Sequence, residues 1–325
     1  MSMLYKRIIG VGTLNEEGGK PEPHFALPAT VNWMKALRVL AEDQNVNFQT
    51  ATSFYSNLKK RTMDQIAENT VLEQLFLALH HLSALEKMRQ EAVAADYARL
   101  AIVGWYYGVS NAASAMIAAQ TSHFQEDHAG TAKAWDNYIA APKMAMEPFS
   151  WRVSSLIENA YKQEVDSYRA GSSTTLHGPV NTTEDARGAL AAYLSGSATW
   201  SAWKASEDAK KSRDFKALQV DDFKTKRARV IRDSILSKRS MGFLHQASRY
   251  RGKANYREAL FLAYGKSAEA TMEGFIADQA IVLRAFIAMA GAFCAKKLGR
   301  TLWNEFVSDI DANRAFSLSA ESVWT

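Results

Sequence analysis

The stretch from Asp96 to Trp135 constrains the fold more than any other part of the sequence. From Asp96 to Ala119, apolar and small residues occupy nearly every side of a predicted helix, which is typical of a helix that neighbours bury all round. Small residues recur along it at steps of three or four, so that another helix can approach closely: Gly104, Gly108, Ala112 and Ala115. A second helix that is apolar nearly all round is predicted at 275–299. We expect these two helices to form the centre of the core together.

Most of the remaining chain is also predicted to be helical. Helical periodicity begins at Val31, and a loop rich in Ser, Thr and Gly ends at Thr182-Thr183-Glu184-Asp185, which is a good helix start. By contrast, Leu4–Leu14 is β-branched and interrupted by glycine, which predicts a strand or short hairpin. The expected fold is therefore mainly α. It consists of an extended or β-containing lead-in at 1–30, a multi-helix core at 31–142 and 236–312, and a long helical insertion at 143–235.

Composition places the chain among ordinary globular proteins. Of its 325 residues, 47% are hydrophobic and 22% are charged. The single cysteine, Cys294, lies in an apolar run, where a buried side chain is expected; one cysteine allows no disulfide within the chain and fits a reducing cytoplasm. No run of about 18 apolar residues and no secretory leader is recognised, so neither a transmembrane helix nor another membrane association is expected.

Positive charge is concentrated between Lys204 and Arg257. This segment holds 16 cations and 6 anions, a net charge of +10, whereas the whole chain carries +5; the rest is therefore about −5. Such a segment is either a solvated helix face or a surface that meets phosphates. The candidate nucleic-acid contacts are Lys224, Lys226, Arg227, Arg229, Arg232, Lys238, Arg249, Arg251 and Lys253.

Aromatic residues accompany these cations. Rings beside cations suit single-stranded RNA, because bases can stack on them. Trp200 and Trp203, however, are three residues apart, and that spacing favours a place in the core for both.

Two parts of the chain, roughly 95–140 and 240–298, together resemble the HEPN superfamily of helical domains. The resemblance rests on Arg99, the pair Tyr106-Tyr107 with the Ala-rich stretch after it, His128 in a polar turn, the run Arg251-Gly252-Lys253-Ala254-Asn255-Tyr256, and a closing helix at 275–298. Asn255 stands where the family usually has Asp. The resemblance implies an RNA-acting homodimer of the kind found in toxin and phage-defence systems. Residues 1–94 and 143–235 are not explained by it.

Nuclease members of this superfamily carry an arginine followed at a short interval by a histidine, and Arg239 and His245 match that spacing. A neutral histidine can take the proton of a ribose 2′-hydroxyl, while an arginine holds the phosphate. On a continuous helix the two side chains would point about 120° apart. They could converge only if the helix breaks at Gly242 or if two chains pair, as the superfamily's nucleases do.

The leading hypothesis is thus a metal-independent endoribonuclease with no cofactor. The alternative is a non-catalytic subunit that binds RNA or DNA, or serves as a scaffold, in a larger complex. For Arg251 and Tyr256 a structural role is favoured over a functional one. The turn from His123 to His128 holds two histidines and two carboxylates, but a turn fixes no ligand geometry, and no metal site is expected there. Motifs of ATPases, dinucleotide-dependent oxidoreductases, serine hydrolases and zinc proteases are absent from the sequence.

Overall fold

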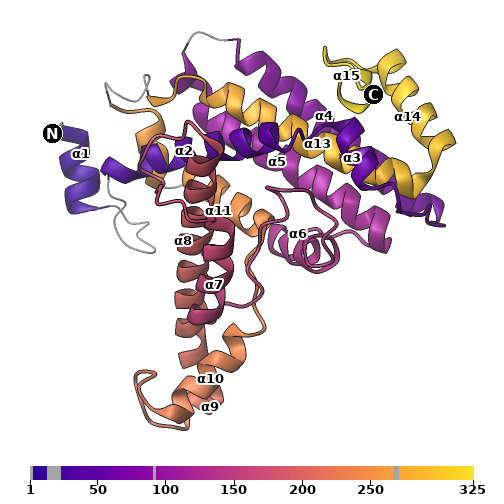
Figure 1. Cartoon of the computed structure of the whole chain (residues 1–325). Coiled ribbons are helices and arrows are strands. Elements are labelled where there is room, and N and C mark those ends of the chain that lie inside the picture. The colour runs from indigo at the N-terminus through magenta and orange to yellow at the C-terminus, as the bar shows by residue number, and fades with distance from the viewer. Residues whose placement is uncertain (1–2, 13–22, 91–92, 256, 266–270) are drawn as a thin grey trace.

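The computed structural model describes residues 3–12, 23–90, 93–255, 257–265 and 271–325, and these are mostly helical (Figure 1). The helices in chain order are α1 (Met3–Tyr5), η1 (Lys6–Val11), α2 (Pro23–Asp43), α3 (Phe48–Phe54), α4 (Gln65–Met88), α5 (Ala94–Thr121), α6 (His128–Trp135), η2 (Asp136–Ala140), α7 (Glu158–Arg169), α8 (Thr183–Lys210), α9 (Arg213–Lys216), α10 (Lys226–Leu236), α11 (Phe243–Asn255), η3 (Arg257–Leu262), α13 (Phe275–Leu298), α14 (Arg300–Asn313) and α15 (Glu321–Trp324). The mainly α prediction is confirmed.

The predicted N-terminal strand is wrong for the described part of Leu4–Leu14. Met3–Val11 forms helical turns, α1 and η1, and residues 13 and 14 lie outside the described residues. A strand needs a partner to receive its backbone hydrogen bonds. Across the described ranges, β pairing is limited to one isolated antiparallel bridge, between Val153 and Met241. The β-branched pattern therefore has no sheet to join.

The centre of the core is α5, which packs against both α4 and α13 (Figure 1). The predicted partnership of the two apolar helices is confirmed. Gly108 explains how the helices come so close: a Cβ there would lie 2.7 Å from Leu283 Cδ2 and 3.2 Å from His81 Cβ. The small-residue prediction thus holds at Gly108. It does not hold at Gly104, where a Cβ would meet no atom within 4 Å.

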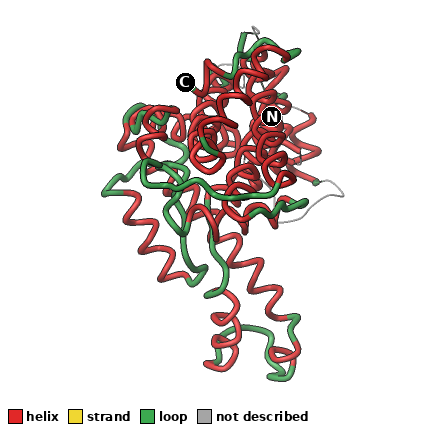
Figure 2. The backbone as a smooth tube through the Cα atoms, turned by 90° about the vertical axis from the view of Figure 1, so that its right-hand side faces the viewer, coloured by secondary structure: helices red, strands yellow, loops and turns green. Residues whose placement is uncertain are grey.

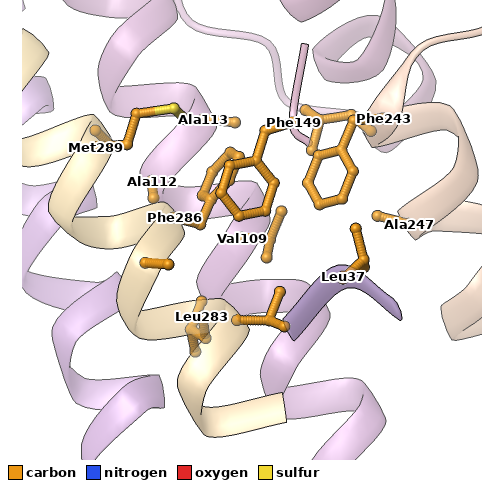
Figure 3. Packing of buried hydrophobic residues seen from close by; sticks show 14 of the residues in the cluster. Leu37, Val109, Ala112, Ala113, Phe149, Phe243, Ala247, Leu283, Phe286 and Met289 are labelled. Carbon is orange, nitrogen blue, oxygen red and sulfur yellow. The ribbon is translucent and has the colours of Figure 1, made fainter. Parts of the chain in front are cut away.

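Aromatic rings join the remaining helices to this centre. The Trp33 ring on α2 lies 5.7 Å from Trp105 on α5, 4.6 Å from Tyr193 on α8 and 4.5 Å from Tyr250 on α11. Figure 3 shows a neighbouring group in which Phe149, Phe243 and Phe286 face one another. Because these rings come from separate stretches of the chain, the expected insertion at 143–235 shares the core of the flanking segments.

Residues 158–236 build an arm that projects from the body (Figures 1 and 2). Its axis is α8, which runs unbroken through Gly196 and, with 28 residues at a rise of 1.5 Å, is about 42 Å long. The helix starts where the sequence predicts, and Thr182 and Asp185 form a capping box there. The helices α7 and α10 pack along α8, and α2 packs on it where it meets the body.

The C-terminal helices cover the far end of α13. The indole Nε1 of Trp324 donates to the carbonyl oxygen of Ile287 at 3.1 Å, and the same ring lies directly on Gly291. A Cβ at Gly291 would overlap that indole, so this glycine makes the close approach of α15 possible.

Candidate nucleic-acid interface

The end of the arm, together with the turn that follows α10, carries the strongest concentration of positive charge. Residues 210–239 hold 11 cations and 4 anions, a net charge of +7. Thr225 caps the start of α10, where its hydroxyl accepts a hydrogen bond from Ala228 N at 3.2 Å, and the helix buries Ala228 and Leu236. The cations of α10 and of the turn after it therefore face outward. We define the tip surface by the four predicted contacts among them that are exposed and make no ion pair within the described chain: Lys226, Arg227, Arg229 and Lys238.

Two further predicted contacts at the tip are already compensated. Lys224 Nζ pairs with Asp222 at 2.9 Å, and Arg232 Nε pairs with Asp233 at 2.8 Å. The hydrogen bond from Lys224 lowers the pKa of Asp222 below its ordinary value. Pairs this exposed stabilise a fold only weakly. They reduce the charge that these two cations can offer a ligand.

The remaining predicted contacts are on α11, nearer the body (Figure 1). Arg249 donates to Ser197 Oγ at 2.9 Å, and the guanidinium of Arg251 lies 4.9 Å from the ring centre of Tyr106. Lys253 belongs to the same helix, and its side chain is outside the described part. The nine predicted contacts therefore fall in two places.

Trp200 and Trp203 are not in the core, so that prediction is wrong. Their exposed fractions are 39% and 55%. The helix α8 instead buries a side that contains Leu194, Ala198 and Ala205. A spacing of three residues puts two side chains on the same side of a helix but does not say which side is buried.

The residues that carry the HEPN resemblance come together between α5, α6 and α11. The ring of His128 lies 5.1 Å from that of Tyr106 and 5.5 Å from that of Tyr107. The guanidinium of Arg251 lies over the Tyr106 ring. Nearby, Arg99 Nε donates to Ala254 O at 3.0 Å. Tyr256 lies outside the described residues.

The electrostatics of this cluster favour an uncharged imidazole. Burial lowers the pKa of His128, and the charge of Arg251 lowers it further, while Asp127 opposes both. A neutral ring can pack edge-on against two tyrosines without losing the hydration of a charge. The Nε of Arg251 is buried and has no hydrogen-bond partner among the described residues.

The two residues of the predicted catalytic pair lie on different elements. The helix α10 ends at Leu236 and α11 begins at Phe243, so the chain does break around Gly242. Arg239 is exposed in the turn, whereas His245 is partly buried on α11. The charges that act on His245 are those of Asp136 and Arg152. Burial lowers the pKa of His245, and Arg152 adds to that effect while Asp136 opposes it.

The hydrogen bond that His245 makes decides what its ring can do. Its Nδ1 accepts from Gly242 N at 3.2 Å. In a neutral imidazole one nitrogen accepts and the other carries the proton, so Nε2 is the protonated atom here. In this arrangement His245 can donate a hydrogen bond from Nε2 but has no free nitrogen to take a proton.

Sequence reasoning missed the ion pair behind this histidine. Asp136 is fully buried. Arg152 donates two hydrogen bonds to its carboxylate, from Nε to Oδ1 at 2.9 Å and from Nη2 to Oδ2 at 2.8 Å. That bond is the main reason that the pKa of Arg152 is raised. A Cβ at Gly242 would lie 2.6 Å from Asp136 Oδ1. An acid within the mostly apolar stretch Trp135–Ala141 is the signal that could have indicated the pair.

Arg152 also lines a pocket of about 510 Å³ at the base of the arm. The pocket holds charges of both signs, but its carboxylates have partners. Glu147 pairs with Arg187 at 2.9 Å, and Glu164 accepts from the backbone N of Ser154 at 2.7 Å. Both carboxylates of the pocket are therefore engaged within the protein and are not free to bind a ligand.

Two further properties bear on function. Among the described residues, no group of three or more His, Cys, Asp or Glu side chains is placed to hold a metal ion. One described helix, α13, is long and apolar enough to cross a membrane, but 78% of its most apolar window is buried, as in the core helix of a globular fold.

Comparison with known proteins found no matching family model, no matching curated protein and no matching solved structure.

Proposed function

We propose that this chain is an RNA-binding protein that contacts the phosphate backbone through the tip surface. The observation that carries the proposal is that the four cations of the tip surface are exposed and lack a carboxylate partner in the described chain. A cation that is already paired gains little from a phosphate. An unpaired one releases the counterions that the nucleic acid holds, and this release drives binding.

A HEPN-like architecture is part of the proposal. Its support is that Tyr106, Tyr107, His128 and Arg251, which come from three separate stretches of sequence, form one cluster. A helical domain of that type, acting on RNA as a dimer in the cytoplasm, fits the mostly helical body.

Cleavage of the bound RNA by Arg239 and His245 is a second candidate function. The break between α10 and α11 favours it, because the two side chains are freed from the 120° separation of a continuous helix. The reaction would require the His245 ring to release Gly242, so that Nδ1 could take a proton. It would also require an arginine, from this chain or a second one, to move next to that ring.

Salt dependence tests the binding proposal. The variant K226Q/R227Q/R229Q removes three cations of the tip surface, and K59Q/K87Q/K133Q removes three exposed lysines of the body as a control with the same change in charge. We expect the slope of log K against log salt to fall by about 2 in the tip variant, at ~0.7 per lost phosphate contact with a single strand. Equal losses in both variants, or a wild-type affinity that ignores salt, would contradict the proposal.

A further inference from the structure

One face of α8 presents aromatic rings to solvent. Gly196, Trp200, Trp203 and Lys204 follow one another at steps of four, three and one, so they lie along one side of the helix, and all four are exposed. We call these four residues, together with Arg249 of α11, the tryptophan face. Large apolar side chains on a surface mark a contact site when they gather in one place.

Two cations lie over the ring of Trp200. Lys204 Nζ lies 5.3 Å and Arg249 Cζ lies 5.5 Å from the ring centre of Trp200. Ser197 fixes the arginine by accepting a hydrogen bond at 2.9 Å. Neither cation has a salt bridge in the described part of the chain, and the next carboxylates along α8, Glu207 and Asp208, are occupied by Lys210 at 2.8 Å and Lys211 at 3.1 Å.

The helix leaves room for a ring beside Trp200. Gly196 precedes it by one turn, is exposed, and would meet no atom within 4 Å if it carried a Cβ. A larger residue at that position would extend into the space next to the indole. The face therefore has two exposed aromatic rings, open space at Gly196 beside Trp200, and two cations over the Trp200 ring.

We propose that the tryptophan face stacks the unpaired bases of a single-stranded nucleic acid whose backbone continues toward the tip surface. This inference rests on the proposed function. Every base has a face that can stack on an indole, and a duplex hides those faces. From Trp200 to Lys210 the helix rises about 15 Å toward the tip, so one strand can contact both places.

Charge decides between a strand and a protein partner. A protein that covered Trp200 and Trp203 would also cover Lys204 and Arg249, which form no ion pair among the described residues. Burying an unpaired cation is costly unless the partner supplies an anion. A nucleic-acid strand brings a phosphate with every base.

The test compares Trp200→Ala, Trp203→Ala and Trp200→Phe with Tyr138→Ala, which removes an exposed ring from the body. The probes are labelled single strands of RNA and of DNA, about 12 nucleotides long, and the RNA duplex of the same sequence. We expect each tryptophan-to-alanine change to raise the Kd for single strands roughly tenfold, and Trp200→Phe to raise it less. The tryptophan variants should bind the duplex with the wild-type Kd, and Tyr138→Ala should bind every probe with the wild-type Kd. Equal losses with RNA and DNA support stacking on bases, while a loss with one of them identifies the strand that binds.

Single-strand affinities that do not change in either alanine variant would overturn the inference, and so would equal losses for single strand and duplex. If K226Q/R227Q/R229Q weakens binding while the tryptophan variants do not, the inference fails and the proposed function stands. If the wild type binds none of the probes in a salt-dependent way, the proposed function itself fails. Light scattering supplies one more criterion: a dimer that becomes monomeric in Trp200→Ala, with unchanged single-strand affinity, would assign the face to a second copy of the chain.

Discussion

The ion pair between Asp136 and Arg152 should be one of the most sensitive points of the fold. Asp136 is fully buried, and the side chain of Arg152 is only 22% exposed. Asp136→Ala would leave the guanidinium without the carboxylate that accepts its two hydrogen bonds. Breaking a buried pair from one side costs about 3–5 kcal/mol of unfolding free energy. We therefore expect Asp136→Ala to lose about that much in urea unfolding, with little change in the slope.

A double-mutant cycle separates the pair from its surroundings. Arg152→Ala should also be destabilising, because it leaves the carboxylate buried and unpaired. The double variant should cost clearly less than the sum of the single ones, with a coupling of roughly 1–3 kcal/mol. A loss below about 1 kcal/mol in Asp136→Ala, or costs that simply add, would refute the reasoning. Either result would mean that water reaches the pair and screens it.

Three further predictions follow from single positions. Gly291→Ala should lower stability by about 1–3 kcal/mol in thermal unfolding, because its Cβ overlaps the indole that covers it, whereas Gly104→Ala should not. Burial raises the pKa of Asp278 to about 6 from 3.8, so the folded state takes up a proton as the pH falls from 7 to 4. Over that range the unfolding free energy of the wild type should rise by roughly 3 kcal/mol at most relative to that of Asp278→Asn. Parallel profiles of unfolding free energy against pH in urea would contradict this. If the chain cleaves RNA, Arg239→Ala and His245→Ala should each abolish cleavage without removing binding, and a cleavage rate equal to wild type in both would end the nuclease hypothesis.

The sequence predicts the centre of this fold well, because local pattern and burial agree there. The helix α5 is buried as its composition indicates, Cys294 is buried in α13, and the capping box at Thr182 starts α8. These features depend on residues close together in sequence.

What the sequence could not supply depends on distant contacts. Leu4–Val11 reads as a strand by residue type, but no described segment pairs with it. Trp200 and Trp203 have a spacing that suits either face of α8, and the side that α7 and α10 cover decides the outcome. Asp136 and Arg152 are 16 residues apart with no pattern linking them.

The unbroken course of α8 has a consequence for how this protein can change in length. One helix joins the ring stack at Trp33 to the end of the arm, so each residue added to it would advance the end by 1.5 Å and turn it by about 100°. A single insertion between Tyr193 and Trp200 would therefore carry the exposed indoles round to another side. Seven added residues complete nearly two turns and would restore their direction. Among related proteins, the equivalents of α8 should therefore differ in length by multiples of about seven residues. Such differences keep the exposed side of the helix pointing in the same direction relative to the body.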